Sequence, residues 1–302
     1  MLVLVNGLPY FGRVLVRDLN EFDSKNKYIF LDTYYSKLDK LFFFFLVPFS
    51  KLIISFNGVS DNSGALNWVL KWKKKILMQW QGSDVMLAKQ RSKDNKIDLR
   101  YINKAVHVTD FEYLFNELSE INIHAKILPF KHLESEINNK RYTKIAVLTY
   151  VSQNNENLYG FDTILEGAKE LADIEFHIIG SNCEYYLPLP DNMYVHGWKS
   201  KYEVKELMNN IPIFIRMTKH DGNALTVSEA LSRGCEVIWT YPSNLTYQAN
   251  SKADLVNQIL FLKKRIEERG LTANQYNSAK ILEHYNKEVV INNYVKFINS
   301  IL

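Results

Sequence analysis

Cysteine is scarce in this sequence, and so are long apolar stretches. The two cysteines, Cys183 and Cys235, lie in or beside apolar, strand-like runs. They exclude a disulfide framework and a metal-ligand spacing, and we expect buried, reduced thiols in a cytoplasmic setting. The longest wholly apolar run, residues 41–49, is nine residues long, too short to span a bilayer. The opening Met-Leu-Val-Leu-Val-Asn-Gly lacks a basic leader and reads as a strand rather than a secretory signal.

Two common nucleotide-binding fingerprints are also missing. Residues 6–12, Asn-Gly-Leu-Pro-Tyr-Phe-Gly, follow the first expected strand. They contain neither the Gly-Lys-Ser/Thr of a Walker loop nor the glycine spacing of a dinucleotide fingerprint. We therefore expect a plain loop here, leading into a helix through Val14, Leu15 and Leu19.

The charge is mildly basic and unevenly distributed. The 302 residues carry a net charge of +4. Residues 1–141 contain 21 Lys and Arg against 15 Asp and Glu, and the remainder contains 16 against 18. A basic first half favours an anionic surface or acceptor as partner, whereas the small overall excess argues against nucleic acid.

Strand-like and helix-like patterns alternate along the whole chain, which predicts an α/β protein with parallel sheets. The length suggests two domains, and the polar, aperiodic residues 132–143 are the best linker. We predict an N-terminal domain over residues 1–135 and a C-terminal domain over residues 144–302. Residues 276–302 are expected to form a last helix that packs back on the N-terminal domain.

Three local predictions concern polar residues beside these elements. Asp61, Asn62 and Ser63 offer N-caps for a helix over residues 65–74. Asp110 is expected to cap the helix that begins near Phe111, and His107 is expected to be a core histidine inside an apolar strand.

The most informative stretch is residues 219–234, which lies between two runs that read as buried strands, residues 211–217 and 235–240. An Asp-Gly turn precedes a short helix, in which Ala224, Val227 and Leu231 fall on one apolar face. Gly234 is placed to end the helix with a left-handed cap. The helix therefore starts at the carboxyl end of a strand, where open α/β sheets bind ligands and helix N-termini attract phosphate.

Two carboxylates frame the start of this helix, Asp221 in the loop and Glu229 eight residues on. Eight helical residues rise about 12 Å, so the two cannot share one proton or one metal ion. They could hold opposite ends of an elongated ligand with phosphates between them, such as a nucleotide sugar. A solvated helix with an acidic N-terminus, favourable for the helix dipole, is the alternative reading.

The stretch resembles the signature of the retaining family-4 type glycosyltransferases, in which an acidic residue and a glutamate are separated by seven residues. Here the frame is Asp221 and Glu229, followed by Ala230 and Gly234. The resemblance covers residues 144–234 and implies the GT-B fold, two Rossmann-like domains facing a cleft. It implies that Glu229 holds the donor ribose, and that the donor sugar and diphosphate meet Asp221, Gly222, Asn223, Ala224 and Leu225.

Weaker parts of the resemblance lie outside this frame. Gln81 stands before Gly82-Ser83-Asp84 where family members have a histidine that touches the donor sugar. Gln81 can donate and accept hydrogen bonds but cannot carry the charge of a protonated histidine. The resemblance places Gly12 near the donor phosphates, and Gly197 and Trp198 beside the nucleobase.

Two phosphate-binding cations of the family are missing. An Arg and a Lys are expected on either side of the loop after the strand at residues 144–149. This sequence has Ser152 or Gln153 and then Tyr159 there. Each lost charge-assisted contact is worth roughly 1.5–3 kcal/mol. Substitute donors are the amides of this loop, or Arg216 and Lys219, and a carboxylate partner would explain Arg216 equally well.

The expected function is transfer of a hexosyl group from a nucleotide sugar to a hydroxyl of a glycan or lipid-linked glycan, with retention. No metal site and no cofactor beyond the donor are expected, and a UDP-sugar is favoured. The resemblance implies that the leaving phosphate takes the acceptor proton. One alternative is a catalytically silent nucleotide-sugar-binding module that serves a partner transferase. A nucleotide-sugar epimerase is another.

The phenylalanine-rich run at residues 41–49 has two readings. It could be a buried helix end, or a segment at a membrane interface flanked by Lys37, Lys40 and Lys51. The helix bearing Trp68 and Trp72 ends in Lys-Trp-Lys-Lys-Lys, which suits a helix C-terminus or anionic lipid. If residues 41–49 lie at a membrane interface and this helix lies on anionic lipid, we expect a cytoplasmic protein bound peripherally to the inner membrane face.

Overall fold

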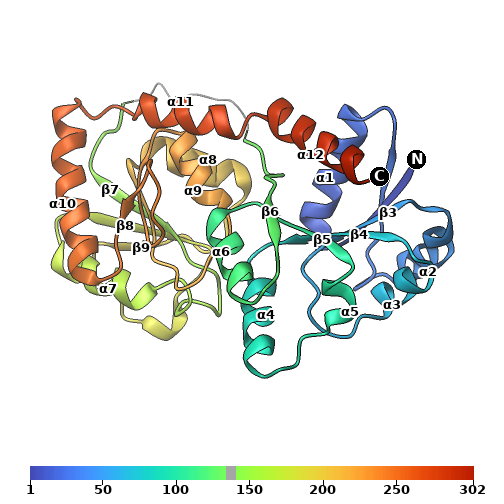
Figure 1. Cartoon of the computed structure of the whole chain (residues 1–302). Coiled ribbons are helices and arrows are strands. Elements are labelled where there is room, and N and C mark those ends of the chain that lie inside the picture. Colours follow the sequence, from blue (N-terminus) through green and yellow to red (C-terminus); the bar gives the residue numbers. More distant parts are fainter. Residues whose placement is uncertain (134–140) are drawn as a thin grey trace. The chain divides into compact units, whose positions relative to one another are not determined.

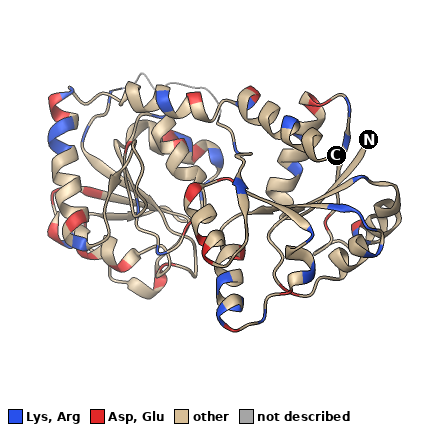
Figure 2. Cartoon of the chain, in the orientation of Figure 1, with Lys and Arg blue, Asp and Glu red and all other residues tan. Residues whose placement is uncertain are grey.

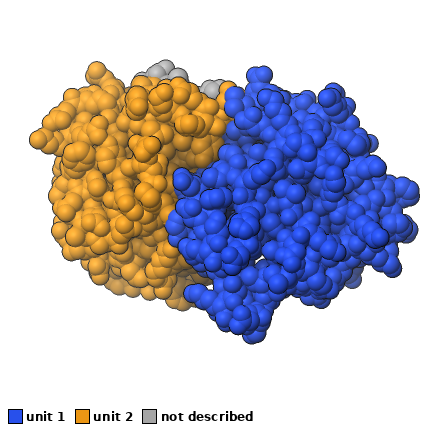
Figure 3. Space-filling view, in the orientation of Figure 1, with its two compact units in different colours: residues 1–132, 221–223, 287–302 blue, residues 133–220, 224–286 orange. Residues whose placement is uncertain are grey.

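The computed structural model describes residues 1–133 and 141–302. Most of the predicted linker, residues 134–140, lies outside the described residues. The chain divides into two compact units (Figure 3). Unit 1 comprises residues 1–132, 221–223 and 287–302, and unit 2 comprises residues 133–220 and 224–286.

Unit 1 is built on a parallel sheet of six strands in the order β2-β1-β3-β4-β5-β6 (Figure 1). Every described pairing in it is parallel. Strands β1 and β3 are buried along nearly their whole length, as expected of parallel strands covered on both faces. The strands are β1 (Leu2–Gly7), β2 (Lys27–Phe30), β3 (Leu52–Phe56), β4 (Lys75–Trp80), β5 (Ala105–Thr109) and β6 (Ala125–Ile127).

The helices of unit 1 come from both ends of the chain. They are α1 (Pro9–Phe22), α2 (Lys37–Leu46) with the 3-10 turn η1 (Val47–Phe49), α3 (Gly64–Lys71), α4 (Ser83–Lys93), α5 (Leu99–Ile102), α6 (Glu112–Glu120) and α12 (Lys287–Ile301). Helix α12 buries Val290, Ile291, Tyr294 and Ile298 in the same core cluster as Leu15 and Leu19 of α1 (Figure 1). The Tyr294 hydroxyl also donates to the Gln79 amide oxygen of β4 (3.0 Å).

Unit 2 holds a second parallel sheet of six strands, in the order β12-β11-β10-β7-β8-β9. Its strands are β7 (Ala146–Tyr150), β8 (Glu175–Ile179), β9 (Met193–Val195), β10 (Ile213–Arg216), β11 (Glu236–Trp239) and β12 (Tyr247–Gln248). Its helices are α7 (Phe161–Glu170), η2 (Glu184–Tyr186), α8 (Lys201–Asn210), α9 (Leu225–Ser232), α10 (Lys252–Glu268) and α11 (Gln275–His284). This is the Rossmann strand order, and its direction reverses between β7 and β10.

Several local predictions are confirmed. The Ser63 hydroxyl accepts from the Leu66 N–H as N-cap of α3, and His107 is buried between Trp80 Nε1 and the Ile102 carbonyl. Cys183 and Cys235 are buried free thiols. Burial raises the pKa of the Cys235 thiol to about 12. Among the described residues, no helix is both long and apolar enough to cross a bilayer.

The prediction for Asp110 is wrong. Helix α6 has Phe111 at its N-cap position, with no side-chain cap bond. The Asp110 carboxylate is buried and pairs with Lys131 Nζ at 2.9 Å. A partner 21 positions away in sequence therefore outcompetes the local backbone N–H groups of the helix.

The prediction of a buried helix end for the phenylalanine run is also wrong for most of its rings. Phe43 and Val47 are buried, whereas Phe42, Phe45 and Phe49 are exposed. The run continues as helix α2 and η1, and a helix places successive side chains on different faces.

Candidate functional site

The carboxyl edge of the unit 2 sheet carries an interlocked set of loops at the point where the strand order reverses. The loop after β7, residues 151–160, touches the loop after β10 directly. The Lys219 N–H donates to the Leu158 carbonyl (2.8 Å), which also accepts from the Thr218 hydroxyl (3.2 Å). Gly160 has φ +67°, and a Cβ there would lie 2.1 Å from the Met217 carbonyl oxygen. Crevices at such a reversal are the usual ligand sites of open α/β sheets.

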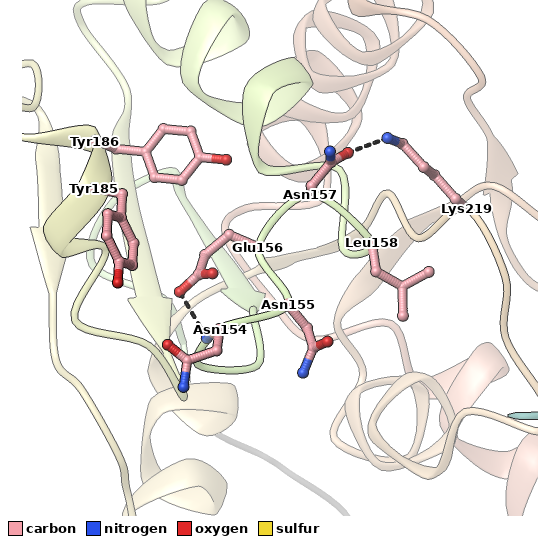
Figure 4. A pocket seen from close by; sticks show the side chains of 8 residues that line it. All are labelled: Asn154, Asn155, Glu156, Asn157, Leu158, Tyr185, Tyr186 and Lys219. Atoms are coloured by element: carbon pink, nitrogen blue, oxygen red, sulfur yellow. Dashed lines mark hydrogen bonds between the residues drawn. The ribbon is translucent and has the colours of Figure 1, made fainter.

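A cavity of about 650 Å³ opens at this edge (Figure 4). Its lining combines three amides, one lysine and one glutamate with Leu158 and two tyrosines. Lys219 Nζ donates to the Asn157 Oδ1, so the loop after β7 positions the cation. The lining residues are Asn154, Asn155, Glu156, Asn157, Leu158, Tyr185, Tyr186 and Lys219.

Glu156 is the acidic residue of this cavity, and sequence reasoning missed it within the amide-rich loop. Burial by itself would raise the pKa of Glu156. Hydrogen bonds from the Ser181 hydroxyl (2.5 Å) and the Asn154 N–H (3.1 Å) outweigh burial, so the pKa of Glu156 is lowered. The carboxylate is thus ionised at neutral pH, and it suits a ligand hydroxyl better than a phosphate.

Arg216 ends strand β10 and is buried. Its guanidinium lies over the Tyr159 ring, 4.9 Å from the centroid, and 6.0 Å from that of Tyr150. Arg216 Nη1 also approaches the Thr226 hydroxyl at 3.5 Å, a long contact. Stacking on two aromatic rings provides a favourable environment for a buried cation, and Thr226 places the guanidinium against the first turn of α9.

Helix α9 has the predicted core face and the predicted end. Ala224, Val227 and Leu231 are buried, and Gly234 follows the helix with φ +74°. The N-cap residue Ala224 makes no side-chain cap bond, and the first N–H groups of any helix have no partner within the helix itself. Glu229 lies three residues after Thr226, which puts both side chains on one face of the helix.

The Gln81 motif is held by a carboxylate in unit 1. The buried Asp84 accepts from the N–H groups of Gln81 (3.0 Å), Gly82 (2.8 Å) and Gly58 (2.5 Å). Desolvation raises the pKa of Asp84. Asp84 therefore fixes the backbone that presents Gln81. The Gln81 Nε2 is buried and hydrogen-bonds to no other group of the described chain.

Residues 221–223 belong to unit 1 and lie against this motif. A Cβ on Gly222 would lie 2.0 Å from the Gln81 carbonyl oxygen, so only glycine fits there. Lys131 Nζ donates to the Asn223 carbonyl (2.7 Å). Unit 1 thus brings Gln81 together with the predicted loop residues Asp221, Gly222 and Asn223, and Lys131 is a contributor that no sequence pattern indicated.

Gly12 does not lie in a loop as predicted, because α1 begins at Pro9. A Cβ on Gly12 would lie 2.5 Å from the Phe30 ring, so this glycine makes room for packing. The glycine that the preceding turn requires is Gly7, with φ +113° and the Phe56 carbonyl oxygen 2.2 Å from the position of a Cβ.

Gly197 and Trp198 follow strand β9 at the carboxyl edge of unit 2. Gly197 has φ +64°, and its carbonyl accepts from the Gly180 N–H (2.7 Å). The Trp198 side chain is 81% exposed. The turn therefore presents an aromatic face and backbone groups beside the loop that follows β8.

Most of the predicted residues fall into two groups, apart from Gly12 in α1 and the turn at Gly197 and Trp198. Arg216, Lys219 and the start of α9 lie together in unit 2, and Gln81 lies with residues 221–223 in unit 1. Across residues 1–133 and 141–302, no three His, Cys, Asp or Glu side chains are grouped so that they could hold a metal ion.

No protein-family profile and no curated protein matches this sequence. Solved structures do match. A TarM variant from S. aureus, in complex with Fondaparinux, alpha-GlcNAc-glycerol and UDP, is 11% identical with a TM-score of 0.60, covering 82% of this chain and 55% of that chain. This chain therefore spans just over half the length of TarM.

Two further structures match along their whole length. The lipopolysaccharide outer core galactosyltransferase WaaB, in its apo form, is 15% identical with a TM-score of 0.66, covering 100% of both chains. Sucrose-phosphate synthase from Thermosynechococcus elongatus is 11% identical with a TM-score of 0.69, covering 100% of this chain and 99% of that chain. At these identities the likeness establishes the fold, and the predicted GT-B fold is confirmed.

Proposed function

We propose that this chain is a nucleotide-sugar-dependent glycosyltransferase that moves a hexosyl group to a hydroxyl with retention of configuration and without a metal ion. The observation that carries the proposal is the amide-bearing cavity at the strand reversal of unit 2. There Lys219 and the loop amides meet, and Arg216 lies against the first turn of α9 nearby. Cations, amides and a helix N-terminus together suit a diphosphate.

Arg216 and Lys219 substitute for the two missing family cations. Tyr159 stands where the family has Lys, and its ring supports the Arg216 guanidinium. Lys219 is held by Asn157 from the same loop. The positive charge that the loop after β7 lacks is thus supplied by residues at and after the end of β10. This supports the proposal that the chain still has a phosphate-binding site.

The remaining roles follow the resemblance. Asp221 and Gln81 position the donor sugar, Glu229 holds the ribose, and the diphosphate lies at Gly222, Asn223, Ala224 and Leu225. Gly197 and Trp198 flank the base, and Gly12 lies near the phosphates. The departing phosphate accepts the acceptor proton, so no protein base is assigned.

The donor base is proposed to be uracil, and the acceptor a glycan or a lipid-linked glycan. The TarM complex contains UDP and a glycerol-linked GlcNAc, and WaaB is a galactosyltransferase of the lipopolysaccharide outer core. The basic first half of the chain suits an acceptor with anionic groups. The working location would be the cytoplasmic side of a membrane.

The test is a thermal-shift screen of the full chain against UDP-, GDP-, dTDP- and CMP-sugars. A ligand at about 100 times its dissociation constant stabilises by about 2.7 kcal/mol. We expect a shift with one nucleotide class, abolished by Glu229→Ala and weakened about tenfold or more in affinity by Lys219→Gln. The matched control is Lys264→Gln on α10, an exposed lysine outside the cavity.

The absence of a shift with every nucleotide would contradict the proposal, as would equal affinity in all three variants. Retention of configuration and metal independence are tested by measuring the transfer reaction itself. Proton NMR of the anomeric product reports retention, and activity that persists in a chelator supports metal independence. Conversion of the donor without an acceptor would instead indicate an epimerase.

A further inference from the structure

Helix α2 is apolar on two opposite sides. Phe43, within the helix, packs in the core. The exposed large hydrophobic side chains of α2 are Leu38, Leu41, Phe42 and Phe45, which follow the spacing i, i+3, i+4, i+7 of one helical face. A contiguous exposed apolar face on a folded protein usually marks an interaction site, so the outer face of α2 indicates a partner.

The outer face of α2 continues through η1 and α3. Phe49 of η1 is 76% exposed, while Phe42 and Phe45 are 56% and 65% exposed. Trp68 Nε1 donates to the Phe44 carbonyl (2.9 Å), and the two rings lie 5.4 Å apart. Trp72 extends this row, 6.0 Å from Trp68. These contacts join α2 to α3, and Lys74 Nζ, just after α3, donates to the Pro48 carbonyl of η1 (2.6 Å). We call the exposed apolar side chains of α2, Phe49 and Trp72 together the aromatic face.

The charge around the aromatic face is strongly basic. The segments 34–51 and 68–75 contain seven lysines and a single acidic residue, Asp39. The Asp39 carboxylate is engaged by the Asp32 N–H (2.9 Å). Lys71 lies over the Trp68 ring at 5.0 Å, and Figure 2 shows blue segments on and beside α2 and α3. The exposed lysines here are Lys37, Lys40, Lys51, Lys71, Lys73 and Lys75.

We infer that the aromatic face docks on the interface of a bilayer that contains anionic lipid. Exposed phenylalanines and leucines can enter the boundary between headgroups and acyl chains, while lysine stems let the ammonium groups reach the phosphates. Tryptophan is favoured at that depth. A second copy of this chain is disfavoured, because two such faces would bring seven lysines against seven.

This inference goes beyond the proposed function and does not depend on it, since vesicle binding needs neither donor nor acceptor. The full chain is centrifuged with vesicles of phosphatidylcholine alone or of phosphatidylcholine with phosphatidylglycerol, at low and high salt. We expect binding to the anionic vesicles that weakens with salt. Failure to bind anionic vesicles at low salt would overturn the inference.

The apolar contribution is tested with Phe42→Ser combined with Phe45→Ser. Both rings are exposed, so the fold should persist, and circular dichroism checks it. We expect vesicle affinity to fall at least about tenfold. The matched control is Leu260→Ser with Phe261→Ser on α10, where the side chains are 47% and 50% exposed. An equal loss in both double variants would overturn the inference.

The basic contribution is tested with Lys37→Glu and Lys40→Glu, each expected to cost at least about fivefold in affinity for anionic vesicles. Their control is Lys264→Glu on α10. Light scattering completes the test. A wild-type dimer that dissociates in the Phe42→Ser, Phe45→Ser variant would assign the face to self-association and overturn the lipid inference.

Discussion

At Gly160, the loop after β7 contacts the loop that follows strand β10. The substitution Gly160→Ala is the sharpest test of that contact. The residue has φ +67°, and a Cβ would lie 2.1 Å from the Met217 carbonyl oxygen and 2.9 Å from the Met217 Cβ. The nearest atom belongs to the backbone, so a side-chain rotation cannot relieve the clash.

Two terms set the size of the effect. Placing alanine in the left-handed region costs roughly 1–2 kcal/mol. Overpacking against a backbone atom typically adds about 1–3 kcal/mol. The free energy of unfolding should therefore fall by about 2–5 kcal/mol. At about 2–4 °C per kcal/mol for a unit of this size, the midpoint should fall by about 4–20 °C.

The assay is thermal and urea unfolding of the full chain beside Gly270→Ala. Gly270 also has a positive φ, +72°, but a Cβ there meets nothing within 4 Å. Gly270→Ala should lose only the free energy of placing alanine in the left-handed region. Gly160→Ala also overpacks, so it should lower the free energy of unfolding by about 1–3 kcal/mol more. Equal losses in the two variants would refute the claimed contact between the loops.

Three further predictions use other parts of the fold. Tyr294→Phe removes the bond to Gln79 and should lower the free energy of unfolding by about 1–3 kcal/mol in urea. A change near zero would mean that this hydrogen bond does not help to hold α12. Desolvation lowers the pKa of His107 in the folded state. Its contribution to stability should therefore be complete above about pH 6.5 and should decrease as the pH falls towards the folded pKa. In His107→Gln, the free energy of unfolding should depend less steeply on pH over this range. Burial raises the thiol pKa of Cys183 and Cys235, so iodoacetamide should modify them only after unfolding, and rapid labelling of the native chain would contradict their burial.

Local chemistry determined much of the fold. Alternating patterns predicted two α/β halves, because buried parallel strands and amphipathic helices leave distinct periods in a sequence. Within α9, the spacing of Ala224, Val227 and Leu231 predicted the core face, and Gly234 predicted the left-handed end. Ser63 was recognisable as a cap because its partner is three residues away.

Predictions failed where the deciding partner is distant in sequence. Asp110 was expected to cap a helix, but Lys131 holds it. Gly12 was expected in a loop, but α1 begins at Pro9 and the distant Phe30 ring leaves no room for a Cβ at position 12. The phenylalanine run of α2 was readable as a helix, yet its pattern could not say which apolar side faces the core.

The sequence by itself determined the α/β class, the spacing of Asp221 and Glu229, and the lack of Arg and Lys in the loop after β7. Only the tertiary structure decided that the ring of Tyr159 supports Arg216, 57 positions away, and that Lys219 meets Asn157 at the cavity. Strand order brings these groups together, and strand order arises from pairings between distant segments. Local propensity carries no record of such pairings, because it acts over a few residues only.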